Sequence, residues 1–292
     1  MNADVAKLAL GTAQFGMRYG VGNSAGHVEL GQVENILKVA RENDVRTLDT
    51  APSYGNSEEV LGSLGVKDLS VISKIVIPDA WSGKLSDWVL GELEGTLSSL
   101  RSGKLHGLLI HNPWNLHMSE GLEFFDVLCG LKADGLVENV GISIYAPEDL
   151  ESLPLELKFD IVQAPMNIMD RRLERGGFFE KLRETGAELH IRSAFLQGLL
   201  LLPDSRIPVY FDPWRELLGE FASWTKEKNI SPLFACLSYV NQMPEVSKII
   251  VGVDSEHQLM EVISAMSQPG LSIPENLQSN DLGLINPSLW AL

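Results

Sequence analysis

The chain has 292 residues, 45% of them hydrophobic, and its 39 acidic and 23 basic residues give a formal net charge of −16. A surface this acidic repels phosphate backbones and anionic lipids, which argues against nucleic acid and membranes as partners. No stretch approaches about 18 uncharged apolar residues, and the N-terminus has no secretory pattern, so we expect neither a membrane span nor a signal peptide.

Short apolar runs alternate with longer amphipathic stretches along almost the whole chain. The apolar runs predict strands at residues 7–11, 45–49, 69–75, 105–111, 137–143, 159–164, 188–193 and 248–252. Apolar residues at helical spacing, such as Val33, Ile36 and Leu37, predict helices between them. These helices cover residues 30–43, 57–64, 87–101, 121–134, 147–153, 177–185, 214–228, 232–241 and 255–266.

Eight strands, each followed by a helix, are the elements of a closed (β/α)8 TIM barrel. A doubly wound open sheet would carry a Gly-x-Gly-x-x-Gly turn after its first strand, and the glycines at 11, 16, 20 and 22 do not have that spacing. No linker, low-complexity segment or charge block divides the chain. We therefore predict a single α/β domain, a (β/α)8 barrel, over residues 1–292.

Ionisable residues lie at the carboxyl ends of three consecutive predicted strands. Asp49 ends the second strand, Lys74 lies near the end of the third, His111 ends the fourth, and Tyr54 follows in the loop after the second. Strand ends of a barrel converge on one pocket mouth. Buried lysine and aspartate are rare unless paired, so we expect a Lys74–Asp49 ion pair. Each residue alone has a structural explanation, but the four together favour a functional site.

Proton transfer to an oxygen is the chemistry that these side chains suit. A tyrosine with a pKa near 10 is a poor acid–base group at neutral pH, but a neighbouring ammonium favours the phenolate. Asp49 would hold the ammonium of Lys74, and His111 would orient the substrate oxygen. General acid catalysis of this type contributes about 10²–10⁴-fold, and a hydride shift would belong to a cofactor.

The predicted strand ends and the turns after them carry the segments LALGTAQFG, LDTAPSYGNSEEVLG, VISK, LLIHNPW, VENVGIS, FDIVQAPMN and RSAFLQGLL. On these segments the chain resembles the aldo-keto reductase superfamily, in particular its bacterial branch, from residue 8 to about residue 262. That family is a (β/α)8 barrel that binds NADPH in an extended form and reduces aldehydes and ketones. The resemblance implies a catalytic tetrad of Asp49, Tyr54, Lys74 and His111, with Tyr54 as the proton donor.

Positions for the cofactor follow from the same resemblance. Ser143 and Gln163 match the residues that bind the nicotinamide carboxamide, although Ile144 replaces the asparagine that usually follows the serine. Arg192 stands where an aromatic residue commonly stacks on the nicotinamide, and a guanidinium can also stack on a planar ring. The other implied cofactor-binding residues are Gly11, Thr12, Gln14, Asp49, Ser193, Gly198, Leu199, Leu200, Gly252, Gln258 and Glu261.

The adenosine end departs most from the family. Many members hold the 2′-phosphate with a Lys-Ser pair and an arginine after strand eight, and here these positions are Gly252-Val253 and Gln258. Asp254 and Glu256 lie close by. Losing two cations and gaining acids weakens recognition of a 2′-phosphate. The family cofactor is NADPH, and we hypothesise that this chain binds it weakly or accepts NADH as well.

Several other residues carry weaker signals. Cys129 and Cys236 lie far apart in apolar surroundings, which predicts reduced core residues of a cytoplasmic protein. The remaining histidines have no metal-like spacing, and we predict no metal site. Trp81, Trp114, Tyr145 and Phe195 either line a substrate pocket or pack in loops. Arg18, Arg171 and Arg172 suggest an anionic or sugar-phosphate substrate, with surface placement as the alternative.

The sequence thus predicts an NADPH-dependent oxidoreductase that reduces a small aldehyde, ketone or sugar carbonyl to an alcohol. Two alternatives stay open: a cofactor-poor sugar isomerase or lyase that uses Tyr54 and Lys74, and a cofactor-binding regulatory subunit. We expect a monomer or a weak homo-oligomer. The physiological substrate depends on loop shapes that the sequence does not disclose.

Overall fold

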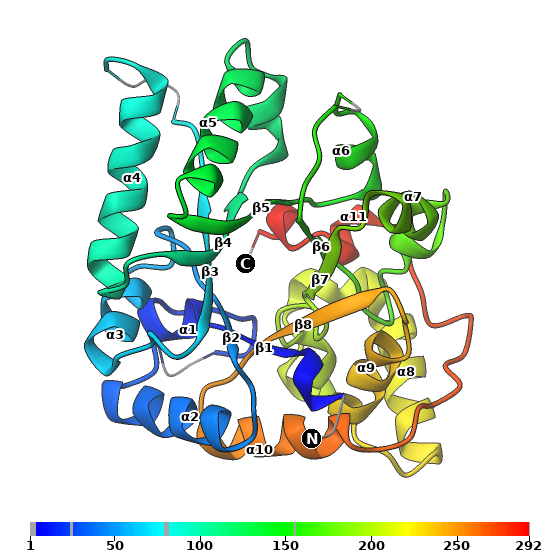
Figure 1. Cartoon of the computed structure of the whole chain (residues 1–292). Helices are drawn as coiled ribbons and strands as arrows, with labels where there is room; N and C mark the ends of the chain where they lie inside the picture. The colour runs from blue at the N-terminus through cyan, green and yellow to red at the C-terminus, as the bar shows by residue number, and fades with distance from the viewer. Residues whose placement is uncertain (1–3, 24–25, 79–81, 155, 292) are drawn as a thin grey trace.

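The computed structural model describes residues 4–23, 26–78, 82–154 and 156–291. In this part of the chain, parallel strands pair in sequence order and close into a barrel, with the last strand against the first. The predicted (β/α)8 barrel is therefore confirmed (Figure 1). Its strands are β1 (Leu8–Gly11), β2 (Thr47–Asp49), β3 (Ser70–Ile75), β4 (Leu105–Ile110), β5 (Val137–Ser143), β6 (Ile161–Pro165), β7 (Glu188–Arg192) and β8 (Val246–Gly252).

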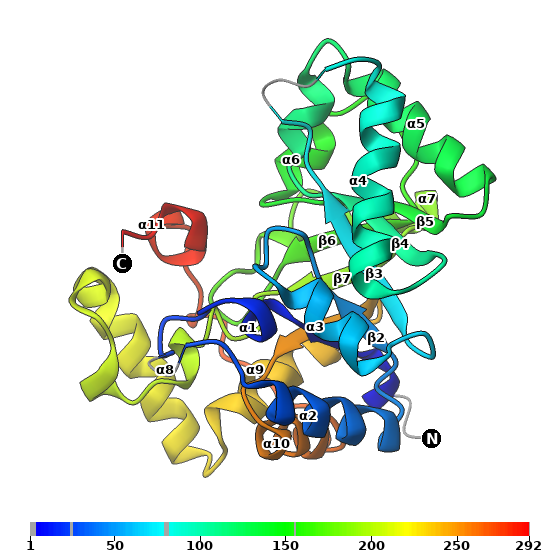
Figure 2. The same ribbon diagram turned by 90° about the vertical axis from the view of Figure 1, so that its left-hand side faces the viewer.

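Helices surround the barrel at nearly the predicted positions. They are α2 (Leu30–Glu42), α3 (Ser57–Leu64), α4 (Leu85–Leu100), α5 (Gly121–Ala133), α6 (Pro147–Glu151), α7 (Phe178–Thr185), α8 (Arg215–Glu227), α9 (Pro232–Asn241) and α10 (Glu256–Met266). Two short helices were not predicted, α1 (Ala13–Gly16) and α11 (Leu282–Ile285). In Figures 1 and 2, α2 and α10 lie side by side, so the helices that follow β1 and β8 cover the strand pair that closes the barrel.

The barrel interior is filled by side chains rather than open. Ile72, Leu109 and Ile161 come from three different strands and form a small buried cluster. Gly141 faces the same region, where an added Cβ would collide with Leu109 and with the Ile161 backbone. Strands buried on both faces read as continuous apolar runs, which is why the sequence pattern identified them.

The loop after β7 contains three short 3-10 turns, η4 (Leu199–Leu201), η5 (Asp204–Arg206) and η6 (Val209–Trp214). The C-terminal tail docks on it. The Trp290 ring packs edge-on against Phe211 at 4.9 Å between centroids, and the Tyr210 hydroxyl donates to Gly283 O at 3.1 Å. The tail therefore supports a loop that also lines the main cavity described below.

One of the two cysteine predictions was wrong. Cys236 is buried in α9, but Cys129 is exposed on α5. The buried face of α5 carries Phe124, Phe125 and Leu128, and the rotation of about 100° per residue turns position 129 toward solvent. Apolar neighbours in sequence therefore did not place this thiol in the core.

Candidate active site

A buried ion pair lies at the carboxyl ends of β2 and β3. Lys74 Nζ is 2.6 Å from Asp49 Oδ1, and the two residues are 2% and 4% exposed, respectively. The ammonium also donates to Thr50 O at 2.9 Å and to the Tyr54 hydroxyl at 3.3 Å. The ion pair expected from the sequence is present, and its ammonium is shared with the hydroxyl of Tyr54.

Charge on Lys74 is maintained despite its burial. Burial disfavours the ammonium, but the Asp49 carboxylate and the Tyr54 oxygen outweigh that cost, and the pKa of Lys74 is raised. The side chain therefore stays protonated at neutral pH. A permanent cation beside the Tyr54 hydroxyl stabilises negative charge on that oxygen.

His111 lies beside Tyr54 and is the fourth side chain of this group. Its ring lies edge-on to the Tyr54 ring, with 6.2 Å between centroids and an interplanar angle of 86°. Burial, and then the charge of Lys74, lower the pKa of His111 from its usual 6.5 to about 4. At neutral pH the imidazole is therefore uncharged, so it can donate one N–H to a substrate oxygen without competing with Lys74 as a cation.

Two glycines hold the Tyr54 loop in place. An added Cβ at Gly16, the last residue of α1, would collide with Tyr54 O and with Ser57 N. Gly55 has φ +61°, and its own Cβ would collide with Gly16 O. The two backbones can touch only because neither residue has a side chain. The unpredicted helix α1 thus supports the loop that carries the phenol.

The second oxygen of Asp49 is also bonded. Gln163 Nε2 donates to Asp49 Oδ2 at 2.7 Å, and Ser143 Oγ donates to Gln163 Oε1 at 3.3 Å. The resemblance placed Ser143 and Gln163 at the nicotinamide carboxamide, and the structure places Gln163 on the Asp49 carboxylate and Ser143 on the Gln163 side chain. Support of Asp49 by Gln163 was missed by sequence reasoning, although a buried amide inside an apolar strand was a signal that it needed a partner.

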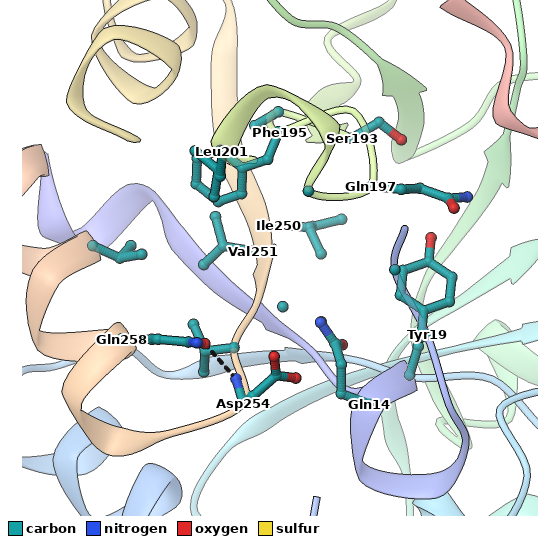
Figure 3. A pocket seen from close by; sticks show the side chains of 18 of the residues that line it. Gln14, Tyr19, Ser193, Phe195, Gln197, Leu201, Ile250, Val251, Asp254 and Gln258 are labelled. Atoms are coloured by element: carbon teal, nitrogen blue, oxygen red, sulfur yellow. Dashed lines mark hydrogen bonds between the residues drawn. The ribbon is translucent and has the colours of Figure 1, made fainter. Parts of the chain in front are cut away.

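A cavity of about 470 Å³ runs from Asp49 and Tyr54 to Gln258 and Glu261. Figure 3 shows side chains from the loops after β1, β7 and β8 around it. Most cofactor positions implied by the resemblance line this cavity: Gly11, Thr12, Gln14, Asp49, Gln163, Arg192, Ser193, Gly198, Gly252, Gln258 and Glu261. Ser143, Leu199 and Leu200 are buried and do not line it.

Sequence reasoning missed several residues of the cavity wall. Tyr19 and Gln197 line it from the loops after β1 and β7, and Leu201 and Leu202 lie where Leu200 was expected (Figure 3). These two loops also contact each other, because Val21 N donates to Gln197 O at 3.0 Å. No residue pattern announces such a contact between two irregular segments.

At the far end of the cavity, backbone and side chains are closely fitted. An added Cβ at Gly252 would collide with the Gln14 side chain. Gln258 Oε1 accepts a hydrogen bond of 2.7 Å from Asp254 N, and Ser255 caps α10. Figure 3 shows the Asp254 carboxylate and Gln14 pointing toward the same space. Among the described lining residues, Asp254 and Glu261 are the acids on this side, Asp49 is a third acid, and Arg192 is the one cation.

The other arginines flagged in the sequence do not line the cavity. Arg171 is buried and donates to the backbone oxygens of Ile168 and Pro274. Arg172 forms an ion pair of 2.8 Å with Asp170. Arg18 donates to Asn23 O on an exposed loop. The anionic-substrate hypothesis therefore gains no support from these three residues.

Of the flagged aromatic residues, Phe195 lines the cavity. Trp114 is 71% exposed on η2 (Pro113–His117), Tyr145 contacts Arg192, and Trp81 lies outside the described residues. Within the described ranges, no three His, Cys, Asp or Glu side chains are grouped so that they could hold a metal ion. In the same part of the chain, no helix is long and apolar enough to cross a membrane.

The closed (β/α)8 barrel thus holds a buried Lys–Asp pair, a phenol and an imidazole together at its strand ends, and Asp49 and Tyr54 of this group line the cavity. The model of the aldo/keto reductase family matches residues 7–276. The chain therefore belongs to the aldo/keto reductase family.

Solved structures of two bacterial proteins have the same fold. Aldo-keto reductase AKR11C1 from Bacillus halodurans, in its holo form, has a TM-score of 0.72 at 18% identity, covering 91% of this chain and 88% of that one. Glycerol dehydrogenase AKR11B4 from Gluconobacter oxydans has a TM-score of 0.68 at 19% identity, with the same coverage of 91% and 88%. At these identities the likeness supports the fold and not a substrate.

A curated aldo-keto reductase from Mycobacterium sp. (strain KMS) is 27% identical over 143 residues. That match covers 45% of this chain and 50% of the relative, so it spans about half of the relative's length.

Proposed function

We propose that this protein is an NAD(P)H-dependent reductase that converts an aldehyde, ketone or sugar carbonyl to the alcohol, with Tyr54 as proton donor. The observation that carries the proposal is the 3.3 Å contact between the ammonium of Lys74 and the hydroxyl of Tyr54, a residue that lines the cavity. A buried cation next to the phenol oxygen stabilises the negative charge that forms there when the proton is transferred to the substrate.

Each tetrad residue has a distinct task in this proposal. Tyr54 gives its proton to the carbonyl oxygen as negative charge develops there, and Lys74 stabilises the phenolate that remains. Asp49, held by Gln163, keeps Lys74 in place and protonated. Neutral His111 donates a hydrogen bond that orients the carbonyl oxygen. Preorganised groups of this kind act on the charge that forms during reaction.

A nicotinamide dinucleotide would supply the hydride, and the cavity fits such a group. Its volume of about 470 Å³ lies in the range of small-molecule and cofactor sites, about 300–1,000 Å³. The absence of a side chain at Gly252 lets the Gln14 side chain lie against the cavity wall, where an added Cβ would collide with it. Gln14, Gly252 and Gln258 would line the cofactor's path toward its adenosine end.

Cofactor preference is the finer part of the proposal. Family membership favours NADPH, but Asp254 and Glu261 line the end where its 2′-phosphate would lie, and no cation lines that end among the described residues. We therefore propose weak NADPH binding with acceptance of NADH. Fluorescence titration with both cofactors tests this, and tight NADPH binding with negligible NADH binding would contradict it.

The test of the activity is oxidation of reduced cofactor in the presence of a panel of small carbonyl compounds. Tyr54→Phe should lower turnover by about 10²–10⁴-fold with little change in cofactor affinity. Tyr239→Phe is a matched control, because that hydroxyl binds Glu174 and Tyr239 does not line the cavity. Conversion of a sugar without cofactor would favour an isomerase or lyase instead. Cofactor binding without turnover of any carbonyl would favour a regulatory subunit.

A further inference from the structure

Arg192 ends β7 at the wall of the cavity and has no acidic partner in the described part of the chain. Its Nη2 donates to Ile144 O at 2.9 Å, and its Cζ lies 5.0 Å from the centre of the Tyr145 ring. One face of the guanidinium thus contacts the Tyr145 ring, and one of its nitrogens donates a hydrogen bond to Ile144 O. A guanidinium has five N–H donors, so most of its hydrogen-bonding capacity is left over.

This pairing pattern differs from that of the other half-buried arginines. Arg172 and Arg215 pair with aspartates, and buried Arg171 donates to three backbone carbonyls. A partly buried cation without a counter-charge is costly. Among the described residues, Arg171 also lacks an acidic partner, but its N–H groups are taken up by three backbone carbonyls, whereas Arg192 makes one hydrogen bond, to Ile144 O.

The backbone that follows Arg192 is also in an unusual conformation. Ser193 has φ +62°, in the left-handed region that a residue with a Cβ adopts only at a cost. Asn167 Nδ2 donates to Ser193 O at 3.1 Å and holds this turn. Strained backbone maintained by specific bonds is typical of functional positions. Here the strained backbone follows directly after Arg192, whose guanidinium contacts Ile144 O and the Tyr145 ring.

Arg192 is also electrostatically close to the reaction centre. After burial and the charge of Lys74, the charge of Arg192 contributes to the lowered pKa of His111. The cation therefore lies at the tetrad end of the cavity, together with Tyr54 and Tyr19, and away from Asp254 and Glu261.

We propose that Arg192 binds a carboxylate or phosphate carried by the carbonyl substrate, so that the enzyme selects anionic aldehydes, ketones or sugars. The inference rests on the proposed reductase activity and names its substrate class. The free N–H groups of Arg192 match the two oxygens of a carboxylate or phosphate, which is the recognition that guanidinium performs best. The anion would sit near the carbonyl group that Tyr54 protonates in the proposed reaction, because Arg192 and Tyr54 line the same cavity.

The experiment compares matched pairs of substrates that differ in one anionic group. Succinic semialdehyde is paired with butanal, and glyceraldehyde 3-phosphate with glyceraldehyde. For the wild type we expect kcat/KM of at least one pair to be about 10- to 100-fold higher for the anion, as charge-assisted hydrogen bonds produce. Arg192→Met should lower this anionic-to-neutral ratio at least tenfold, and Arg192→Lys should give an intermediate ratio. The ratio cancels any effect common to both substrates, such as altered cofactor binding.

Arg18→Met is the matched control, because it removes an exposed cation of the loop after β1 that does not line the cavity. It should leave the ratio within about twofold of the wild type, since screened surface charges act weakly. NADH and NADPH dissociation constants are measured by fluorescence for every variant. If Arg192→Met weakens cofactor binding and leaves the ratio unchanged, Arg192 serves the cofactor and the inference is wrong.

Failure of this inference and failure of the proposed function have different signatures. Turnover of neutral carbonyls with no preference for either anion overturns the role of Arg192 alone. Absence of turnover with both members of both pairs contradicts the reductase proposal and this inference together. If Arg192→Met does not fold, the ratio for Arg192→Lys decides, because that variant keeps the charge and loses the planar fork.

Discussion

Gln163 Nε2 lies 2.7 Å from Asp49 Oδ2 and joins β6 to β2 across the barrel. The other oxygen of the same carboxylate binds Lys74 at 2.6 Å. With both oxygens bonded, the carboxylate plane is held, and so is the ammonium that contacts Tyr54. The position of the Tyr54 phenol thus depends on a residue that is 114 positions from Asp49 in the sequence.

Removing this support should weaken the folded state. Gln163→Met deletes a buried hydrogen bond to a charged group, which is worth about 1.5–3 kcal/mol of unfolding free energy. Urea unfolding at neutral pH measures the loss. Gln268→Met changes an exposed glutamine and should stay within about 0.5 kcal/mol of the wild type. Equal stability of the two variants would show that the Gln163–Asp49 bond contributes nothing.

The Lys74–Asp49 pair should be costly to break. Asp49→Asn leaves a buried ammonium without its counter-charge, and such changes cost about 3–5 kcal/mol. Chemical denaturation again provides the measurement. Glu151→Gln breaks the exposed pair with Lys181 and should cost at most about 1 kcal/mol. A loss at Asp49 no larger than at Glu151 would mean that the pair is solvated.

His111 should make stability depend on pH. Its folded pKa, about 4, lies below the usual 6.5, so the unfolded chain binds the proton more tightly. Its contribution to stability is therefore complete above about 6.5 and is lost as pH falls from there toward 4. The free energy of unfolding, measured between pH 6.5 and 4, should fall less steeply with decreasing pH in His111→Gln than in the wild type.

Proton binding by His111 can also be followed directly. NMR titration of the imidazole signals, assigned by comparison with His111→Gln, should show no protonation of His111 between pH 6 and 8. A midpoint in that interval would contradict the neutral role assigned to His111 in the site.

The contact between α1 and the Tyr54 loop can be tested with glycine variants. Gly16→Ala places a Cβ against backbone atoms of Tyr54 and Ser57 that cannot rotate away. We expect a loss of about 1–3 kcal/mol, as for other overpacked sites, together with lower carbonyl turnover. Gly91→Ala lies in α4, where an added Cβ meets no atom within 4 Å, and should stabilise by about 0.5–1 kcal/mol. Equal effects of the two changes would exclude a close contact at Gly16.

Charge at the adenosine end should set the cofactor preference. Asp254→Asn removes a carboxylate that lines the cavity, and one charge interaction of about 1 kcal/mol corresponds to about fivefold in affinity. NADPH affinity should therefore rise by about this factor, while NADH, which lacks the 2′-phosphate, changes little and serves as the internal control. Fluorescence titration measures both constants. A parallel change for both cofactors would show that Asp254 does not face the 2′-phosphate.

Much of the architecture was readable from residue patterns. Apolar runs of strand length alternating with amphipathic helices lead to a (β/α)8 barrel, because buried parallel strands and one-sided helices have characteristic periodicities. The barrel then brings Asp49, Lys74 and His111 together through strand order alone. The sequence by itself therefore determined the fold and the Lys74–Asp49 pair.

Only the tertiary structure decided which side chains form hydrogen bonds or ion pairs with one another and which are buried. Gln163 binds Asp49 from another strand, Arg171 lies inside the protein, and Cys129 faces solvent. Arg192 lies at the cavity with no acidic partner among the residues that the structure describes. Such outcomes depend on helix rotation and loop conformation, where one residue's turn or one positive φ redirects a side chain by several ångströms. Periodicity does not encode these choices, because they are resolved by contacts between residues far apart in the chain.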